Sequence, residues 1–393
     1  MILRKAYRYR LRPTPTQARA LEQVLDYCRE LYNAAIQERR DAYEMAKVRI
    51  DYYEQKRELP DVKEVRPEYR DVGSQVLQDV IRRVDLAFQG FFRRVAAGDK
   101  PGYPRFKGRD RYDSFTYTQV GWKIEDSRLV LAKIGAIRVR WTRPIEGTIK
   151  TVTIHRSLGQ WHVCFSCVLD VPDPVTPDRP ATAIDVGLES FATLADGSHI
   201  DNPRYFREAH DVLARRQRSR DRKKKGSKNR RRANRLVAKA HRRIRNKRLD
   251  FHHQEARKLV DAHGAIAFEG LRIKNMIRRP GPKIDEKKTK AAGQTVYAPN
   301  GASAKSGLNK SIHDAGWHQF LTILTHKAGE AGVVIVVVDP AGTSQVCSGC
   351  GRVVPKTLDD RWHTCPYCGL SIHRDHNSAR EILNRAGLSR AGA

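Results

Sequence analysis

The chain has 393 residues, and its 75 Lys and Arg against 44 Asp and Glu give a formal net charge of +31 and a pI near 10.1. This balance excludes an ordinary metabolic enzyme, while an apolar content of 40% excludes a disordered basic tail. Charge on this scale is typical of proteins that bind phosphate backbones, and at roughly 100–200 residues per domain the length allows two to four domains.

The opening sequence, MILRKAYRYRLRP, has no apolar core of a signal peptide, and no stretch of the chain approaches ~18 consecutive apolar residues. The basic runs also lack the Trp, Phe and Leu face of a membrane-binding helix. We therefore expect a soluble, cytoplasmic protein whose partner is nucleic acid and not a membrane.

The first part of the chain predicts a strand followed by helices. Residues 3–12 alternate, which suits a strand with basic and aromatic faces, and Thr16 can cap the helix that follows Pro15. Apolar residues then recur at three and four over 17–46, and a second such stripe covers 74–97 and includes its phenylalanines. Together these stretches predict a helical module inserted after the first strand.

The next segment predicts a small β-domain. A basic, aromatic loop at 98–109, GDKPGYPRFKGR, precedes short alternating runs within 114–170, namely FTYTQV, SRLVLAKI, AIRVRW, KTVTIH and WHVCFSCVL. Runs of this length separated by turn signals favour a barrel-like or small-sheet fold. The proline-rich segment at 171–180 marks a domain boundary.

Beyond that boundary the pattern is α/β. Strands ATAIDV and FATLA are followed at 215–248 by a block of 19 Lys and Arg and a single acid, which places +18 in 34 residues. Solvated helix faces usually mix charge signs, so we expect this block to be a helix that contacts phosphates. A strand at 265–269, a loop without periodicity at 278–306 and a helix near Trp317 come next. The run VVIVVV at 333–338 predicts a strand covered on both faces.

Four cysteines form two CxxCG units: Cys347 with Cys350, and Cys365 with Cys368. A two-residue spacing lets both thiolates of each unit face one tetrahedral ion, so we expect a structural zinc site in which four thiolates leave no position for water. Cys164 and Cys167 share the CxxC spacing, but on a strand they point to opposite faces and are expected to serve packing.

Three acids stand where buried charge is expensive unless it is paired or bound to metal. Asp185 interrupts an apolar strand, Glu269 ends another, and Asp375 lies just beyond the cysteines at the start of a helical pattern. Convergent carboxylates of this kind hold two Mg²⁺ ions for phosphodiester cleavage. The alternative makes Asp185 a strand-end cap, Glu269 a partner of Arg272 and Asp375 a helix cap.

Several motifs in order along the chain identify a family. They are YRYRLRPTPTQ, AIDVGLESFATLADG, KKKGSKNRRR, RIRNKRLDFHH, AFEGLRIKNM, LNKSIHDAGWHQF, TSQVCSGCG and CPYCGLSIHRDHNSAREIL. With them the chain resembles the TnpB proteins of bacterial and archaeal insertion sequences, also called OrfB-type transposases, over nearly its whole length. The resemblance implies a mobile-element-encoded, RNA-guided DNA endonuclease related to the type V CRISPR effectors, in a prokaryotic, nucleoid-associated setting.

The resemblance also implies an α+β multidomain fold: a wedge β-barrel with an inserted helical recognition module, then an RNase H-like (RuvC) α/β nuclease domain with an inserted zinc ribbon. The expected boundaries are 1–13 for the first wedge strand, 14–100 for the helical module, 101–178 for the wedge, 179–342 for the RuvC core with a basic helical segment at 206–260 and a flexible loop at 278–306, 343–371 for the zinc ribbon, and 372–393 for the final helix and tail.

By position, Asp185, Glu269 and Asp375 match the three metal-binding RuvC acids of the family, with two Mg²⁺ and one Zn²⁺ as expected cofactors. The chain departs from the family at His373, where an Asp is common, and in a 278–306 loop that is longer than usual; that loop could act as a lid. The expected partners are a guide RNA from the mobile element and double-stranded target DNA carrying a short flanking motif, with no small-molecule substrate.

Candidate nucleic-acid contacts come from the first strand, the helical module, the aromatic loop and the basic block. They are Arg4, Lys5, Tyr7, Arg8, Tyr9, Arg10, Gln75, Gln78, Tyr103, Lys107, Lys223, Lys224, Lys225, Lys228, Arg230, Arg231, Arg232, Arg242 and Arg243. Gln75, Gln78, Tyr103 and Lys107 are candidates for reading the flanking motif, although a scaffold role suits each equally. Two other functions stay open: a nuclease-inactive RNA-guided repressor or zinc-ribbon RNA-binding protein, and an RNA-independent RuvC-like nuclease or transposase.

Overall fold

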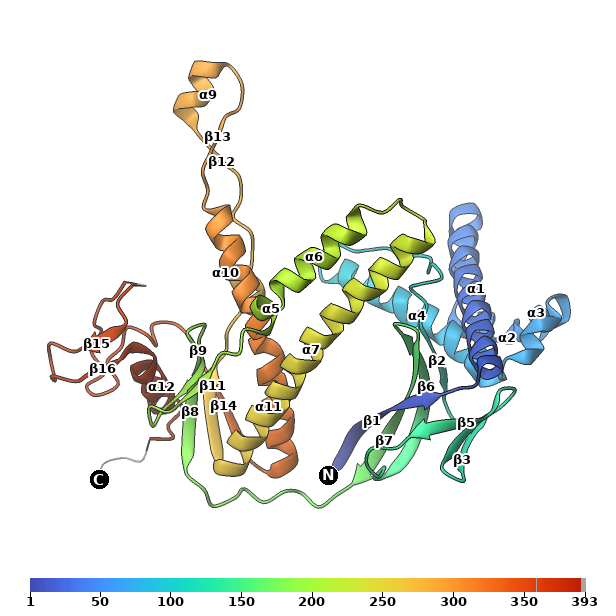
Figure 1. Cartoon of the computed structure of the whole chain (residues 1–393), viewed down its shortest axis with the longest axis horizontal. Coiled ribbons are helices and arrows are strands. Elements are labelled where there is room, and N and C mark those ends of the chain that lie inside the picture. Colours follow the sequence, from blue (N-terminus) through green and yellow to red (C-terminus); the bar gives the residue numbers. More distant parts are fainter. Residues whose placement is uncertain (358, 390–393) are drawn as a thin grey trace. The chain divides into compact units, whose positions relative to one another are not determined.

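The computed structural model describes residues 1–357 and 359–389. The chain divides into two compact units, the first ending at Pro172 and the second beginning at Asp173 (Figure 1). We describe each unit by itself. Among the described residues, no helix combines the length and the apolar character needed to cross a membrane.

The first unit is built on a curled antiparallel sheet with the strand order β2-β6-β7-β1-β5-β4-β3 (Figure 1). Its strands are β1 (Ile2–Arg12), β2 (Ser114–Tyr117), β3 (Trp122–Glu125), β4 (Arg128–Leu131), β5 (Gly135–Arg140), β6 (Thr148–Ser157) and β7 (Gln160–Asp170). The expectation of a barrel is corrected to a half-barrel, because β2 and β3 are the edges of the sheet over the described chain. Helices complete the core in place of further strands.

The central strand β1 explains how the sheet is oriented. Tyr7, Tyr9 and Leu11 are buried, whereas the intervening arginines are exposed, so the alternation of the sequence separates an apolar face from a basic one. On β7 the same rule buries Cys167 and leaves Cys164 half-buried, on the opposite face, as their spacing predicts.

Helices cover the apolar face of this sheet and share its core. They are α1 (Pro15–Ala46), α2 (Tyr52–Arg57), α3 (Leu59–Val65), the 3-10 turn η1 (Pro67–Asp71) and α4 (Ser74–Ala96). Thr14 and not Thr16 caps α1, in a capping box with Gln17. The short helices α2 and α3 were not predicted, because neither is long enough to repeat an apolar stripe.

The second unit contains a mixed sheet with the strand order β10-β9-β8-β11-β14. These strands are β8 (Ala181–Val186), β9 (Ser190–Leu194), β10 (His199–Asp201), β11 (Ala265–Glu269) and β14 (Val334–Val338). The pairs β8–β9 and β9–β10 are antiparallel, whereas β11 runs parallel to both β8 and β14. The carboxyl ends of β8, β11 and β14 therefore meet at one edge of the sheet.

Helices cover both faces of this sheet (Figure 1). Helices α7 (Lys228–Ala262) and α11 (Trp317–Ala331) pack on the face that presents Ile184, Ile266 and Phe268. Helix α12 (Arg374–Arg385) packs on the other face, where Ala183 and Ala267 contact Ile382. Two alanines at this contact let the helix approach the strands closely.

The edge strand β14 corrects one expectation. Its β-branched run predicts a strand covered on both faces, but Val334 and Val337 are 44% and 58% exposed. These two valines lie on opposite faces of the strand. A run of valines specifies strand conformation and not what covers it, because the same residues suit a strand at the edge of a sheet, where neither face is fully covered.

The basic block forms two helices and not one. Helix α6 (His210–Asp221), which follows the single-turn helix α5 (Tyr205–Glu208), packs against α7. The turn between α6 and α7 includes Gly226 in a left-handed conformation, and Ser227 caps α7. Glycine relieves the strain of that conformation, so the KKKGSK motif is a reversal of the chain.

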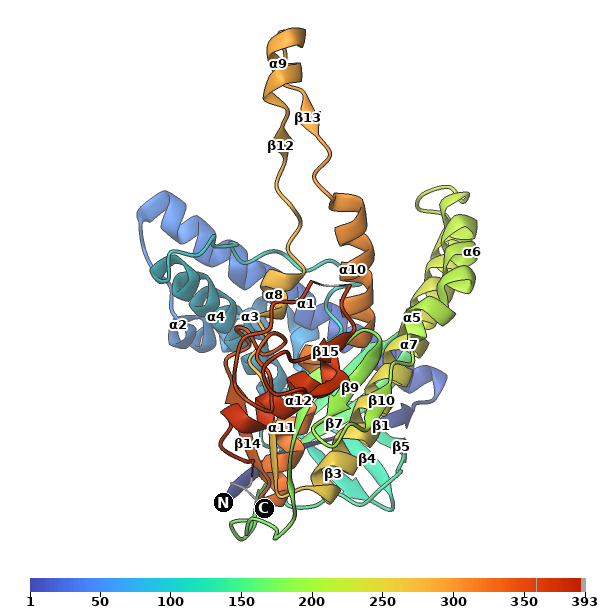
Figure 2. The ribbon, with the colours of Figure 1, turned by 90° about the vertical axis from the view of Figure 1, so that its left-hand side faces the viewer.

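The segment 278–306 also differs from the expected structureless loop. It holds the hairpin β12 (Lys283–Ile284) with β13 (Tyr297–Ala298) and helix α9 (Glu286–Ala292), and it leads into α10 (Ala302–Ala315). In two views this arm extends beyond the end of α10 (Figures 1 and 2). Local backbone pairing over two residues per strand leaves no periodicity for a sequence to reveal. The single-turn helix α8 (Ile273–Met276) precedes the arm.

In the helical module, Glu58 lies near a second carboxylate, that of Glu38. Burial, followed by the hydrogen bond and charge of Glu38, raises the pKa of Glu58 to about 7. A carboxyl whose pKa is higher in the folded state binds more protons there than in the unfolded chain. Its stabilising contribution is therefore present at acid pH and is lost as the pH rises through about 7.

We predict that Glu58→Gln raises the thermal midpoint of the protein at pH 8.5 and leaves it nearly unchanged at pH 5, because the amide stays neutral at both. Thermal unfolding followed by circular dichroism at the two pH values measures this. Glu64→Gln, an exposed substitution on α3, is the matched control. An equal shift of the thermal midpoint at both pH values would contradict the raised pKa of Glu58.

Candidate active site and metal centre

Three acidic residues of the second unit come from β8, β11 and α12. In the parallel register Phe268 lies opposite Ile184, so Asp185 and Glu269, one residue further, are neighbours at the carboxyl ends of their strands. Because side chains alternate, both acids project to the face that presents Ala183 and Ala267, which is the face that α12 covers. Asp375 lies in the first turn of α12.

The electrostatics of Asp185 follow from this convergence. Burial, then the charges of Glu269 and Asp375, raise the pKa of Asp185 well above its usual value, and the nearby Arg374 opposes them. A Cβ built on Gly187 would lie 3.9 Å from Oδ2 of Asp375, which shows that this carboxylate reaches the chain just after β8. The charges of Glu269 and Asp375 therefore both act on Asp185.

Glu269 is held by groups that the sequence did not single out. The hydroxyl of Thr343, a buried residue after β14, donates a hydrogen bond to Oε1 of Glu269. Burial raises the pKa of Glu269, while this hydrogen bond and the charge of Arg385 on α12 lower it. Arg272, the partner suggested by sequence, is not among the groups that shift this pKa. Thr343 follows Gly342 in an irregular segment, so no pattern marks it.

The motif after His373 fixes α12 in place. The ring of His373 accepts a hydrogen bond from the backbone N–H of Asp375, so His373 and not Asp375 caps the helix. Nε2 of His376 lies 3.1 Å from the carbonyl oxygen of Ala195, in the turn after β9. Asn377 is fully buried and bridges the helix to the first cysteine unit, accepting from the N–H of Ser348 and donating to Val346.

The acids differ in spacing from a compact single-ion site. Among the described residues, only the four cysteines form a group of three or more metal-type ligands whose donor atoms all lie within 4.8 Å. Hard divalent cations such as Mg²⁺ bind carboxylate oxygens and keep several waters, and paired ions lie about 3.5–4 Å apart. Carboxylates that are spaced further apart than the ligands of a single ion therefore suit such a pair. The donor set at Asp185, Glu269 and Asp375 fits such cations.

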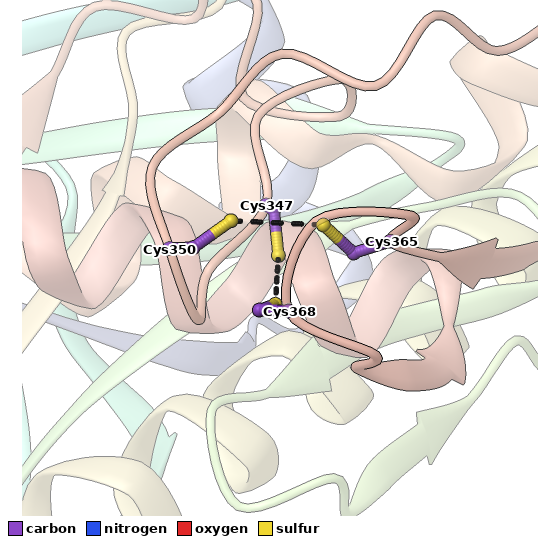
Figure 3. Close-up of side chains that lie close together, drawn as sticks. All are labelled: Cys347, Cys350, Cys365 and Cys368. Carbon is purple, nitrogen blue, oxygen red and sulfur yellow. Dashed lines mark hydrogen bonds between the residues drawn. The ribbon is translucent and has the colours of Figure 1, made fainter.

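The four cysteines converge as their spacing predicts (Figure 3). The Sγ atoms of Cys347 and Cys368 lie 3.6 Å apart, as do those of Cys350 and Cys365. A tetrahedral zinc ion with Zn–S distances of about 2.3 Å needs sulfur atoms about 3.8 Å apart, so the geometry fits. Gly351 and Gly369 take left-handed conformations that close each turn, and their N–H groups donate to the carbonyls of Cys347 and Cys365.

Short strands surround the cysteine cluster. β15 (Trp362–Thr364) pairs with β16 (Ser371–His373), which leads directly into α12. Asn384 of α12 donates to the carbonyl of Ser348, a second tie between that helix and the first cysteine turn. The cluster and α12 therefore form one packed substructure.

On the first unit, arginines from three strands lie side by side on the outer face of the sheet. Arg10 is opposite Arg140, Arg12 is opposite Arg138, and Arg138 is also opposite Arg128. Like charges in directly opposed positions destabilise a sheet. Within the described residues these five arginines have no ion-pair partner, so the surface is suited to a polyanion.

The aromatic residues of β1 correct one part of the contact prediction. Tyr7 and Tyr9 are 5% and 2% exposed, and their hydroxyls donate to Glu146 and to the carbonyl of Arg143. Lys5 is on the same face and pairs with Glu146, whereas Arg4 and Arg8 are exposed beside Arg10. The alternation is as predicted, but the aromatic face is the core.

The other predicted contacts fall into three groups. The side-chain oxygen of Gln75 accepts from the N–H groups of Gln119 and Val120, and Arg230 donates to the carbonyls of Arg220 in α6 and Lys223 just after it, so both have structural roles. Lys223, Arg242, Gln78 and Lys107 are half-buried. The exposed members are Lys224, Lys225, Lys228, Arg231, Arg232, Arg243 and Tyr103.

Comparison with known proteins connects these features to a family. A family model described as "Probable transposase" (OrfB_IS605) matches residues 164–279, and the "Cas12f1-like, TNB domain" model matches 317–382. A model described as "Helix-turn-helix domain" matches 1–47, which here form β1 and the single helix α1.

Two relatives match nearly the whole chain. "Putative RNA-guided DNA endonuclease InsQ" of Escherichia coli is 32% identical over 385 residues, covering 96% of this chain and 91% of its own. "Putative RNA-guided DNA endonuclease" of Streptomyces pristinaespiralis is 33% identical over 399 residues, covering 98% and 90%.

Solved structures support the fold. The mini-RNA-guided endonuclease CRISPR-Cas_phi3 has a TM-score of 0.50 at 10% identity, covering 99% of this chain and 93% of its own. CasPhi-2 (Cas12j) bound to crRNA also has a TM-score of 0.50, at 9% identity, with 98% of each chain covered. At these identities the likeness concerns the arrangement of the backbone.

We predict that the purified protein carries about one zinc per chain and that Cys350→Ser or Cys368→Ser removes it, because three thiolates do not close the tetrahedron. Metal binding supplies ~10–16 kcal/mol of folding free energy in zinc-finger peptides, so loss of zinc should unfold this segment. Elemental analysis and the fluorescence of Trp362 measure the two effects. Cys164→Ser is the control, and full zinc content in Cys350→Ser would contradict the site.

We predict that, without divalent metal, Asp185→Asn raises the thermal midpoint more at pH 8 than at pH 5. The raised pKa of Asp185 means that the stability linked to its protonated form is lost as the pH rises, and Asn removes that loss. Each kcal/mol corresponds to about 2–4 °C in a unit of this size. Asp314→Asn, which weakens the buried acceptor of the Phe206 N–H, should lower the midpoint instead. A lower midpoint for Asp185→Asn would contradict this account.

Proposed function

The chain belongs to the TnpB family, which is related to the type V CRISPR effectors, and we propose that it is an RNA-guided DNA endonuclease that hydrolyses target DNA beside a short flanking motif. The observation that carries the catalytic part is the electrostatic coupling of Asp185 to Glu269 and Asp375. A partly buried carboxylate whose ionised form is disfavoured by two neighbouring carboxylates is typical of a functional site, because this repulsion does not stabilise the fold.

The acids take the roles of metal ligands in this proposal. Asp185, Glu269 and Asp375 would hold two divalent cations, which would supply charge neutralisation at the phosphate and activation of the attacking water. Because the pKa of Asp185 is raised, this carboxyl must give up its proton to serve as a ligand, so affinity for metal should rise with pH. Thr343 orients Glu269 through its hydrogen bond, and the tie between α12 and the turn at Ala195 fixes Asp375.

The RNA and DNA partners suit the basic surfaces. The arginines opposed on β1, β5 and β4, with Arg4 and Arg8, form one surface for a phosphate backbone, and the exposed bases of the α6–α7 hairpin form another. Each arrangement places several positive charges together, which favours a polyanion. We propose that the guide RNA occupies these surfaces and that base pairing supplies sequence specificity.

We propose that the flanking motif is read by the helical module and the loop after α4. Gln78 on α4 and Lys107 in the loop are the candidates, because Gln75 already holds the chain at Gln119 and Val120. The backbone of Lys107 is fixed by Asn33 on α1, so its side chain starts from a defined position.

The test is cleavage of a plasmid library that carries a randomised motif beside a guide-matched target. We expect cleavage that needs guide RNA and Mg²⁺ and that falls to background in Asp185→Ala. Thr343→Val should lower the rate by about 10–100-fold, as loss of a group that orients a ligand does. Thr325→Val, an exposed threonine on α11, is its control and should cut at the wild-type rate.

Other outcomes identify the alternatives. Guide-dependent binding without cleavage by wild type would indicate an RNA-guided repressor. Cleavage that is equal with and without guide would indicate an RNA-independent nuclease or transposase. Full activity in Asp185→Ala would exclude the proposed acids.

A further inference from the structure

A cavity of about 440 Å³ in the helical module has no role in the function proposed above. It lies where the end of α1, the start of α2, the end of α4 and the following loop meet. Its aromatic lining comprises Tyr43, Phe88, Phe91, Phe92 and Tyr103. The sequence predicts the phenylalanines as part of a buried stripe, but Phe92 is 54% exposed and Tyr103 is 44% exposed.

The rings form an ordered array. Tyr103 stands edge to face against Phe88 and Phe91, with centroids 5.5 and 5.4 Å apart, and Phe91 meets Phe92 in the same way at 5.2 Å. Aromatic side chains that face solvent at a cavity and are fixed by each other offer flat surfaces at low entropic cost. Exposure of this kind at a concave site marks a binding function more often than a packing fault.

A buried arginine lies beside the rings. The guanidinium of Arg39 lies 5.3 Å from the centre of the Phe88 ring, and its side chain is 7% exposed. Arg39 forms an ion pair with Asp85 and donates a hydrogen bond to Gln55, and its Nη2, which protein atoms cover, has no hydrogen-bond partner among the described residues. Arg39 therefore packs against the Phe88 ring and offers no exposed Nη2 donor to a ligand.

The charged groups of the lining are two arginines and two aspartates. Asp85 pairs with Arg39, and Asp51 accepts the backbone N–H groups of Tyr53 and Glu54 as the cap of α2. Arg49 is exposed and has no ion pair within the described chain. Arg49 is therefore the group of the lining that can contact an anionic part of a ligand.

We propose that this cavity binds an unpaired nucleobase of RNA. The base would stack on the aromatic lining, while the exposed Arg49 contacts the adjoining phosphate. Stacking of splayed bases on aromatic and arginine planes is how proteins read unpaired RNA. Duplex DNA keeps its bases paired, which favours RNA as the source. This inference rests on the proposed function in that it takes RNA to be the partner.

The test uses the full chain freed of RNA, a short unstructured RNA, the same sequence as DNA, and an abasic RNA. We expect Phe92→Ala and Tyr103→Ala to weaken RNA binding by about 5- to 150-fold, the equivalent of one stacked base, with the salt dependence unchanged because no phosphate contact is lost. Phe92→Trp should restore affinity. Leu86→Ala, which removes an equally exposed side chain of α4 outside the cavity, is the matched control.

The outcomes are distinct. Weakening in Phe92→Ala and Tyr103→Ala but not Leu86→Ala, absent for abasic RNA, together with photo-crosslinks from 4-thiouridine to the end of α4, would support the site. Unchanged RNA affinity in both variants, or an equal loss with abasic RNA or with DNA, would overturn it while leaving guided cleavage intact. Failure of wild type to bind any RNA would overturn both this inference and the proposed function. Unchanged thermal midpoints establish that the variants fold.

Discussion

Repulsion among partly buried carboxylates is the constraint around which the second unit is organised. Asp185 and Glu269 stand side by side at strand ends and Asp375 approaches them from a helix, so like charges gather where water is scarce. A fold can keep such a group together only if strong contacts elsewhere hold the elements that carry it. Strands β8 and β11 are paired by backbone hydrogen bonds, and α12 is tied at both its turn contact and its cysteine contact.

The same logic separates the two basic regions from the cores. Opposed arginines on β1 and β5 and the Lys and Arg runs of α6 and α7 repel one another, and each is carried by an element whose other face is apolar and packed. Burial of Tyr7, Tyr9 and Leu11 keeps β1 in place although its outer face is unfavourable. Stability and function are thus divided between the two faces of single elements.

Much of this arrangement could be predicted from the sequence, and the failures have definite causes. Period-two and helical patterns predicted β1, α1, α4, β8 and β11, and the CxxCG repeat predicted the sulfur cluster, because each signal is local. Tyr7 and Tyr9, predicted as nucleic-acid contacts, lie in the core, because an alternating pattern separates two faces of a strand without showing which face is buried. Thr343 and Asn377 were missed because their roles depend on partners distant in sequence.

The motif from His373 to Asn377 divides its work among four of its five residues: His373 caps the helix, Asp375 carries the acid, His376 contacts a turn and Asn377 joins the cysteine cluster. On a helix with 3.6 residues per turn, one inserted residue rotates all that follows by about 100°. If Asn377 kept its contacts with the cysteine turn, an insertion between Asp375 and Asn377 would therefore turn the Asp375 carboxylate away from the strands. Length variation among relatives should be absent from this interval and concentrated in segments such as the β12–β13 arm, which extends beyond the end of α10.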